Sequence, residues 1–388
     1  MPQMISPLLI INIVFSALYF IMAMYFLVGW LRLKSPKSEV GDQKTEPFVS
    51  IIIPVRNESE HIKDCLESVF KQNYPQHLFE VIVVDDYSTD STLRLAQEFH
   101  QKNLLVLNLK QYLGSSGEDF PNKKKAIALG IKNAKGSLII TTDGDCVARE
   151  KWIRSLTKFY MANEFKLVTS PVMMKPAKFP IEIFQQLDVI NLVGITGATI
   201  RNNFPTMCNG ANLMYAKQTF LEVEGFKGNY DVPSGDDIFL MEKINERYPN
   251  SIGFLKNFDA CVFTKPQRSF SGFISQRVRW ASKSSRFVDW KVQAVLYFAY
   301  LFNLIILIDC LFTLQMQGKG MSWLPLAVAG GTKLFADFMF SIPLTIFFRK
   351  WLLLLLLPLI EVFHVLYVVI IGVFSLRGKY RWKDRRIN

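Results

Sequence analysis

The sequence predicts an α/β domain with a mainly parallel sheet, flanked on both sides by transmembrane helices. An uncharged apolar run extends from Ser6 to Trp30, which is long enough to cross roughly 30 Å of hydrocarbon. Further long apolar segments follow Lys291. Between these regions, residues 47–290 alternate strand-like and helix-like patterns, as in parallel sheets that are covered by helices.

The composition combines a membrane-associated part with a polar part. Half of the 388 residues are hydrophobic, yet 20% are charged and the formal net charge is +12. The basic residues gather at Arg32–Lys37, Lys123–Lys125, Arg268–Lys291 and Arg377–Arg386. Three of these groups flank apolar runs, which favours membrane lipids over nucleic acid as the partner. The five Cys and four His are dispersed, which argues against a zinc site or disulfide framework and fits a reducing, cytosolic setting.

The first apolar run is expected to be a retained anchor, within residues 1–34. Its start lacks Lys and Arg, whereas Arg32, Lys34 and Lys37 follow it, so its C-terminal side should face the cytoplasm. We therefore expect an integral protein of the inner or plasma membrane, with a cytoplasmic domain over residues 47–290.

The C-terminal membrane region, residues 291–376, contains two clear spans at Val292–Met316 and Leu352–Leu376. The segment Leu324–Phe348 between them is weaker, with Lys333 and Asp337 spaced for an ion pair on one helix face. If all three segments cross, the basic tail over residues 377–388 lies outside. We favour a re-entrant or interfacial middle segment, because the tail then lies in the cytoplasm.

Two ionisable residues lie inside the last span. Glu361 and His364 are one turn apart. Such groups within a membrane are candidates for function, and a polar contact between helices is the alternative.

Four strands are expected in the polar part, at Phe48–Val55, Phe79–Val84, Leu104–Leu109 and Ser137–Thr142. Helices are expected over 62–70 and over 123–134, the second closed by Gly136 at its C-cap. Ligands of open α/β sheets bind beyond the carboxyl ends of the strands. The polar residues that follow the first, second and fourth strands should therefore meet on one rim.

Two aspartate motifs lie on this rim. In VDDYSTD, Asp85 and Asp86 follow an apolar strand, which a turn or helix cap alone does not explain. In DGD, Asp143 and Asp145 can approach one Mg²⁺ or Mn²⁺ ion that keeps positions for diphosphate oxygens and water. A turn is the structural alternative for DGD. No GxGxxG or GxxxxGK[ST] loop follows the first strand, so a carboxylate-bound metal would have to neutralise a phosphate-bearing ligand.

A third motif, SGDD, precedes a helical run. Ser234 and Asp237 have the spacing of a capping box. The helix dipole would also stabilise Asp237 as an anion, which is compatible with a role as a base.

The fourth motif is QRVRW. Gln276, Arg279 and Trp280 share one helix face, where the guanidinium would counter phosphate charge and the indole would stack on a sugar ring. The alternative is an interfacial helix that contacts lipid headgroups. We prefer this alternative for Arg277, Lys283 and Arg286.

In this order, the four motifs resemble family 2 glycosyltransferases with the GT-A fold, over roughly Pro47 to Trp280. They are most similar to the membrane-bound branch with a QxxRW signature, which includes cellulose, hyaluronan and poly-N-acetylglucosamine synthases and ceramide glucosyltransferase. The resemblance implies a nucleotide-sugar donor, expected to be a UDP-sugar, an Mg²⁺ or Mn²⁺ cofactor and inverting transfer of a hexosyl or N-acetylhexosaminyl group.

The resemblance also implies residue roles. Asp237 would be the general base, with Asp236 beside it. Asp143 and Asp145 would hold the metal. Residues expected at the donor are Pro54, Arg56, Glu58, Asp85, Asp86, Lys123, Asp143, Asp145 and Arg279. Residues expected at the acceptor are Gly210, Asn212, Gln276 and Trp280. Asn122 stands where the family usually has glycine.

The short distance from Trp280 to the next span at Val292, with two or three spans in all, disfavours an intrinsic polymer channel. We therefore expect transfer to a lipid or lipid-linked glycan, with processive exopolysaccharide synthesis as the alternative. A non-catalytic membrane scaffold or nucleotide-sugar sensor is the alternative from another class. It is disfavoured because the expected metal ligands and base are all present.

Overall fold

The computed structural model describes residues 7–35, 46–113, 122–230, 234–282, 289–315, 323–375, 380–382 and 385–387. The chain divides into two compact units. The α/β unit comprises Leu33–Ala177 and Thr199–Pro266, and the helical unit comprises Met1–Arg32, Lys178–Ala198 and Gln267–Asn388. The division differs from the expected domain over 47–290, because residues 178–198 and 267–290 belong to the helical unit.

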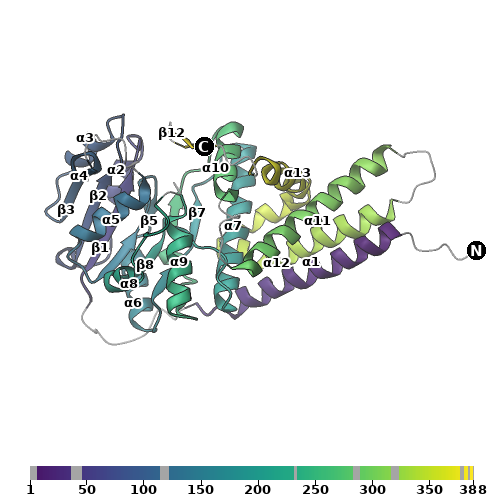
Figure 1. The fold of residues 1–388 in the computed structure, drawn as a ribbon, viewed down its shortest axis with the longest axis horizontal. Coiled ribbons are helices and arrows are strands. Elements are labelled where there is room, and N and C mark those ends of the chain that lie inside the picture. The colour runs from purple at the N-terminus through teal and green to yellow at the C-terminus, as the bar shows by residue number, and fades with distance from the viewer. Residues whose placement is uncertain are drawn as a thin grey trace, which may run out of the picture. The chain divides into compact units, whose positions relative to one another are not determined.

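A seven-stranded sheet forms the centre of the α/β unit (Figure 1). Its order is β3-β2-β1-β4-β8-β6-β9, and only β8 runs antiparallel to its neighbours β4 and β6. The mainly parallel α/β fold is thus confirmed. The strands are β1 (Val49–Val55), β2 (Phe79–Asp85), β3 (Leu104–Asn108), β4 (Leu138–Thr141), β6 (Leu167–Thr169), β8 (Leu213–Ala216) and β9 (Ile252–Phe254).

The strands β1 and β2 are mostly apolar because both faces of the sheet are covered. Every residue of β1 and β2 is buried. The helices of this unit are α2 (Ile62–Phe70), α3 (Thr92–Gln97), α4 (Leu109–Leu113), α5 (Lys123–Asn133), α6 (Trp152–Met161), α8 (Lys217–Glu222) and α9 (Asp236–Arg247). A smaller sheet contains β5 (Val147–Ala148), β10 (Val262–Thr264) and β7 (Val172–Met174), in the order β5-β10-β7. Short 3₁₀ turns cover Gln76–Leu78 and Phe258–Ala260.

The expected C-cap at Gly136 is wrong, because α5 already ends with Ala134 at that position. Gly136 serves a different purpose. A Cβ there would lie 2.7 Å from the backbone nitrogen of Ser50, so only glycine allows the chain to pass this close to β1.

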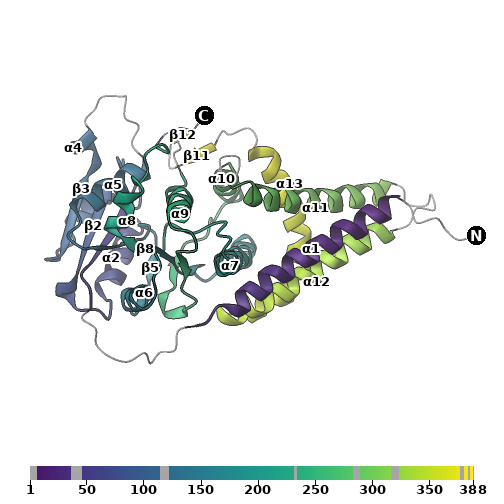
Figure 2. The ribbon, with the colours of Figure 1, turned by 60° about the horizontal axis from the view of Figure 1, so that its bottom comes forward.

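The helical unit is built from six longer helices in the described ranges. They are α1 (Pro7–Arg32), α7 (Pro180–Arg201), α10 (Phe270–Ala281), α11 (Trp290–Gln315), α12 (Leu324–Phe347) and α13 (Leu357–Ser375). A 3₁₀ segment, Trp351–Leu356, precedes α13, and β11 (Tyr380–Trp382) pairs with β12 (Arg385–Ile387). The helices α1 and α12 run side by side (Figure 2). The last residues of α7 belong to the α/β unit.

Four segments among the described residues are long and apolar enough to cross a membrane: 7–32, 180–201, 290–315 and 351–375. This finding indicates membrane association. The segment 180–201 was not anticipated, because Glu182 and Asp188 interrupt its apolar pattern.

The middle C-terminal segment, α12, is one helix with Pro343 inside it, and it is not among these four segments. Its expected ion pair is confirmed, since Lys333 Nζ lies 2.5 Å from Asp337 Oδ2. Lys333 also pairs with Glu361 of α13.

Candidate active site

The rim of the sheet forms because three parallel strands end close together. Val55 at the end of β1 pairs with Asp85 at the end of β2. On its other side, β1 pairs in parallel with β4, whose last residue Thr141 lies two positions before Asp143. The predicted convergence of these polar segments on one rim is therefore observed.

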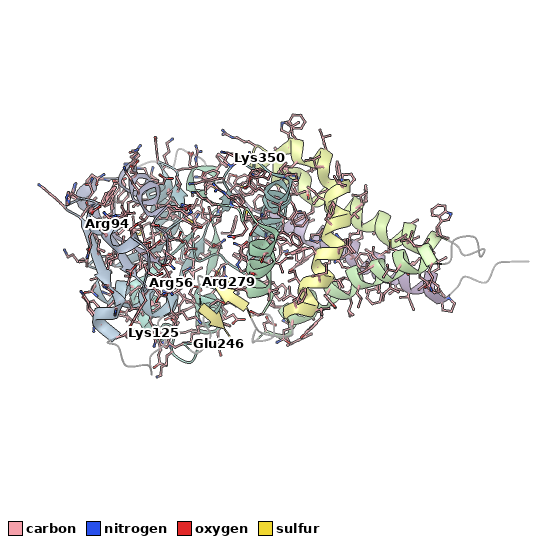
Figure 3. All side chains as sticks on the ribbon, turned by 90° about the horizontal axis from the view of Figure 1, so that it is seen from above. Arg56, Arg94, Lys125, Glu246, Arg279 and Lys350 are labelled. Carbon is pink, nitrogen blue, oxygen red and sulfur yellow. The ribbon has the colours of Figure 1, made fainter. Side chains whose placement is uncertain are left out.

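Arg56 and Asp85 form the β1–β2 part of the rim. Arg56, which is labelled in Figure 3, donates from Nη1 to the carbonyl oxygens of Asp86 at 2.8 Å and Tyr87 at 2.6 Å. Asp85 is buried, and its Oδ2 accepts a hydrogen bond from the backbone of Ser88 at 3.1 Å. Its Oδ1 has no hydrogen-bond partner within the described residues. Burial raises the pKa of Asp85, although the Ser88 hydrogen bonds oppose the rise. This edge thus carries a buried acceptor atom.

Pro54, Glu58 and Asp86 complete this part of the rim. Pro54 is buried within β1, and Glu58 and Asp86 are also buried. The backbone nitrogen of Glu58 donates to Thr92 Oγ1 at 2.7 Å, which ties the loop after β1 to the start of α3.

Lys123 joins two of the predicted motifs. Its Nζ lies 2.7 Å from Asp143 Oδ1 and 3.1 Å from Asp236 Oδ2. Burial of the ammonium opposes its charge, but the carboxylates of Asp143, Asp236 and Asp237 prevail and raise the pKa of Lys123. The DGD motif and the acidic pair Asp236 and Asp237 are distant in the sequence. Lys123 therefore holds them close together.

Asn122 explains how Lys123 is held. It is the N-cap of α5, and its side-chain oxygen accepts a hydrogen bond from the backbone of Lys125 at 3.0 Å. Asparagine is among the best residues at this position. Asn122 therefore supplies a cap and fixes Lys123 as the first residue of the helix.

Asp237 lies in the first turn of α9, and its carboxylate accepts hydrogen bonds from the backbone. Gly210 donates to Oδ2 at 3.1 Å and Ile238 donates to Oδ1 at 2.8 Å. Gly210 is constrained as well, because a Cβ there would lie 2.8 Å from Asp236 Oδ2. Two backbone donors at a helix start favour the anionic carboxylate.

The predicted capping box at Ser234 is wrong. The N-cap of α9 is Gly235, with φ of 84° and no side-chain cap. Ser234 Oγ is buried and makes no hydrogen bond within the described residues. A left-handed conformation at the N-cap turns the serine away from the first turn of the helix.

The carboxylates of DGD offer oxygen ligands suited to a hard divalent cation. Asp143 retains about a third of its side-chain exposure, 34%. Asp145 Oδ2 accepts a hydrogen bond from Thr264 Oγ1 at 2.9 Å, which orients it. The described residues contain no group of three or more potential ligands among His, Cys, Asp and Glu. An Mg²⁺ or Mn²⁺ ion held by this pair would need its remaining ligands from a bound diphosphate and water. Thr264 was not anticipated, and no motif marks it.

The expected acceptor contact of Asn212 is wrong, because its side chain is fully buried in the core. Its Oδ1 accepts from Trp152 Nε1 at 2.9 Å, and its Nδ2 donates to the carbonyl oxygens of Pro171 and Ala260, both at 2.9 Å. Asn212 thus supports the loop that carries Gly210 by linking it to neighbouring segments.

The QRVRW motif lies on α10, which belongs to the helical unit. Ser269 caps this helix, its Oγ accepting from the backbone of Gly272 at 3.1 Å. Gln276, Arg279 and Trp280 follow in its last turns, and Arg279 is labelled in Figure 3.

The expectation that Arg277 contacts lipid headgroups is wrong. Its guanidinium is buried, lies 2.5 Å from Asp188 Oδ2, and sits 4.2 Å from the centre of the Trp280 ring. Lys283 and Arg286 lie outside the described residues.

Comparisons with known proteins relate this sequence and fold to glycosyltransferases. Residues 50–187 match the family model described as glycosyl transferase family 2. Glycosyltransferase AglE of Haloferax volcanii is 39% identical over 111 residues, which is 28% of this chain and 34% of that protein. A dolichyl N-acetyl-alpha-D-glucosaminyl phosphate 3-beta-D-2,3-diacetamido-2,3-dideoxy-beta-D-glucuronosyltransferase of Methanococcus voltae is 33% identical over 115 residues, 29% of this chain and 34% of that protein. The match thus spans about a third of the length of these relatives.

The solved structure of a mannosyltransferase from Pyrobaculum calidifontis, in complex with GDP-Man and Mn²⁺, covers 96% of this chain and 99% of its own, with a TM-score of 0.59 and 20% identity. The fold is therefore that of a GT-A-like α/β protein with long apolar helices. Residues 50–187 thus resemble glycosyl transferase family 2.

Proposed function

We propose that this protein is an inverting glycosyltransferase that moves a sugar from a nucleotide-sugar, expected to be a UDP-sugar, to a lipid or lipid-linked glycan acceptor at the cytoplasmic face of a membrane. The observation that carries the proposal is the position of Lys123 between Asp143 and Asp236. It brings the carboxylates suited to a metal and those suited to a base to one point on the rim.

The nucleoside is proposed to bind over the ends of β1 and β2. Asp85 Oδ1 is a buried acceptor atom without a partner in the described structure, which suits an N–H group of the base. Arg56 holds the loop of Asp86 and Tyr87 by hydrogen bonds to two carbonyl oxygens and so shapes this pocket. Pro54 and Glu58 would form its wall.

Asp143 and Asp145 would hold the divalent cation, which when bound supplies positive charge to the diphosphate of the donor. Asp143 is at the same time the partner of Lys123. The ammonium would share this carboxylate with the metal and remain beside the developing negative charge of the leaving diphosphate. Arg279 of the QxxRW signature is proposed as a further positive group for the diphosphate.

Asp237 is proposed as the general base. Asp236 is paired with Lys123, whereas the carboxylate of Asp237 accepts hydrogen bonds from the backbone N–H groups of Gly210 and Ile238. Asp237 would take the proton of the acceptor hydroxyl while that oxygen bonds to the anomeric carbon. The bond from this carbon to the diphosphate oxygen breaks at the same time, and the diphosphate leaves with the electron pair. A positioned base typically contributes ~10²–10⁴-fold.

A membrane-bound acceptor is supported by the four apolar helices of spanning length. The name of the relative from Methanococcus voltae also describes a dolichyl-linked sugar phosphate as its acceptor. Gly210, Gln276 and Trp280 are proposed to contact the acceptor. Processive polysaccharide synthesis is the second candidate, which the QxxRW signature favours. The intact set of carboxylates argues against a scaffold or sensor without activity.

The test uses the purified full-length chain with Mn²⁺ or Mg²⁺, a panel of UDP-sugars and GDP-mannose, with and without lipid extract. Released nucleoside diphosphate is measured, and products from radiolabelled donor are sized. We expect release that needs metal and rises with lipid extract, and a short lipid-extractable product. A high-molecular-weight product would support the polysaccharide alternative. Absence of release with every donor would overturn the proposed enzyme.

A further inference from the structure

The helical unit contains a cavity between α7 and α13, with a volume of about 80 Å³. A single buried water needs only about 15 Å³, so the space admits a larger group. Five of the lining side chains are apolar, and the other four are Asp188, Asn191, Glu361 and His364. The lining thus suits a small amphiphilic group.

The charges around this cavity decide which group it accepts. None of the described residues that line it is Lys or Arg. Arg277 and Lys333 do not line the cavity and are paired with carboxylates, Arg277 with Asp188 and Lys333 with Asp337 and Glu361. A phosphate in the cavity would therefore face two carboxylates and no Lys or Arg among the lining residues, which a poorly solvated interior makes unfavourable.

The same lining retains capacity to accept hydrogen bonds. Asp188 is more than nine-tenths buried, and its Oδ2 is paired with Arg277 Nη2 at 2.5 Å but accepts no hydrogen bond within the described residues. Within the same residues, Asn191 Oδ1 accepts one hydrogen bond, from Ser341 Oγ at 3.0 Å. Carboxylate and amide oxygens can each accept more than one hydrogen bond. The cavity therefore favours a ligand that donates hydrogen bonds and carries no negative charge.

We propose that this cavity binds the hydroxyl-bearing head of an uncharged membrane lipid, of the diacylglycerol kind, with its hydroxyl group donating to Asp188 or Glu361. The apolar lining residues contact the carbon atoms next to that hydroxyl. The inference rests on the proposed function in one respect. If the bound lipid is the acceptor, the substrate is a neutral lipid alcohol and not a prenyl phosphate.

The experiment compares two tryptophan variants on α13. Ile360 lines the cavity, and Ile360→Trp fills part of it without replacing a charged group. Val362 is two residues away and 61% exposed, so Val362→Trp adds the same side chain on the outer face. Binding of dioleoylglycerol to the full-length chain in detergent is measured by native mass spectrometry, with undecaprenyl phosphate and phosphatidylethanolamine as competing probes.

We expect saturable binding of dioleoylglycerol that Ile360→Trp weakens by about tenfold, equal to about 1.4 kcal/mol, and that Val362→Trp leaves unchanged. Equal binding to both variants, or preferential binding of undecaprenyl phosphate or phosphatidylethanolamine, would overturn the assignment. Nucleotide-sugar binding, measured on the same samples, reports correct folding. A wild-type chain that binds dioleoylglycerol but releases no nucleoside diphosphate from any donor would contradict the proposed function while leaving the lipid site in place.

Discussion

Each unit of this protein places one lysine between two carboxylates, and the two arrangements differ in exposure. Lys123 of the α/β unit bridges Asp143 and Asp236, and Asp143 keeps 34% of its side-chain exposure. Lys333 of the helical unit lies between Asp337 and Glu361, which keep 15% and 12%. A carboxylate that solvent reaches can exchange its lysine for a metal or phosphate ligand. In the buried arrangement Lys333 is not expected to exchange its carboxylates, and its ion pairs are expected to hold α12 against α13.

The largest effect is expected for Asp237→Asn, which tests the function of the exposed arrangement. Transfer should fall by ~10²–10⁴-fold, because the amide cannot take a proton. The initial rate of nucleoside diphosphate release measures this loss. Glu246→Gln, an exposed change on the same helix α9, is the matched control and should keep the wild-type rate. Full activity of Asp237→Asn would exclude Asp237 as the base.

The next effect concerns the buried lysine. Lys333→Met leaves Asp337 and Glu361 without their cation, and breaking a buried ion pair in this way typically costs ~3–5 kcal/mol. Thermal unfolding in detergent should occur at a clearly lower temperature. The triple change Lys333→Met, Asp337→Leu and Glu361→Leu should recover most of the loss. An unchanged melting temperature of Lys333→Met would contradict a structural role.

Lys123→Met tests the same chemistry at the rim, where we expect a smaller loss of stability and a larger loss of transfer. Removing the ammonium frees Asp143, so this variant should bind Mn²⁺ more tightly than the wild type, as measured by calorimetric titration. Weaker Mn²⁺ binding would show that Lys123 positions the metal ligands and does not compete with the metal.

The raised pKa of Lys123 determines how its contribution to folding stability depends on pH. The folded-state pKa of Lys123 lies above the usual 10.5, so its contribution to stability is fully present below that pH and is lost as pH rises through the folded value. The difference in melting temperature between wild type and Lys123→Met should therefore be constant from about pH 6 to pH 9.

The smallest effect is expected for Asp85→Asn. Because burial raises the pKa of Asp85, its ionised form destabilises the folded state above that pKa, and this penalty vanishes below the unfolded value of 3.8. The variant should melt slightly higher than wild type at pH 7, and the difference should disappear as pH falls toward 3.8. Its affinity for the nucleotide-sugar should fall. Lower stability at pH 7 would contradict the buried, unpartnered state of Oδ1.

The two regions also differ in how far the sequence predicts them. The strands that end at Asp85 and just before Asp143 are visible as apolar runs followed abruptly by acids, and their convergence follows from the parallel sheet. The pairing of Lys123 with Asp236 was not predicted, because it depends on how α5 and α9 meet in three dimensions. The misassigned cap at Ser234 has a local cause, since a left-handed Gly235 outweighs the capping-box spacing.

In the helical unit, sequence reasoning identified the pair of Lys333 and Asp337 because both lie on one helix at i and i+4. It did not find Asp188 as the partner of Arg277, because the two residues lie on helices far apart in the chain. The helix α7 was missed for a related reason. Asp188 is paired with Arg277, and Glu182 accepts hydrogen bonds from the backbone of Lys178 and Phe179. A hydropathy pattern does not record such contacts.

The central claim is that the aspartate rim binds a metal and a nucleotide-sugar for transfer. Its most direct test is Mn²⁺-dependent release of nucleoside diphosphate from a nucleotide-sugar by the purified chain with lipid extract, in wild type and in Asp143→Asn. We predict saturable dependence on Mn²⁺ in the wild type and release near background in the variant. Equal release by both proteins would contradict the assignment of Asp143 and the account built on it.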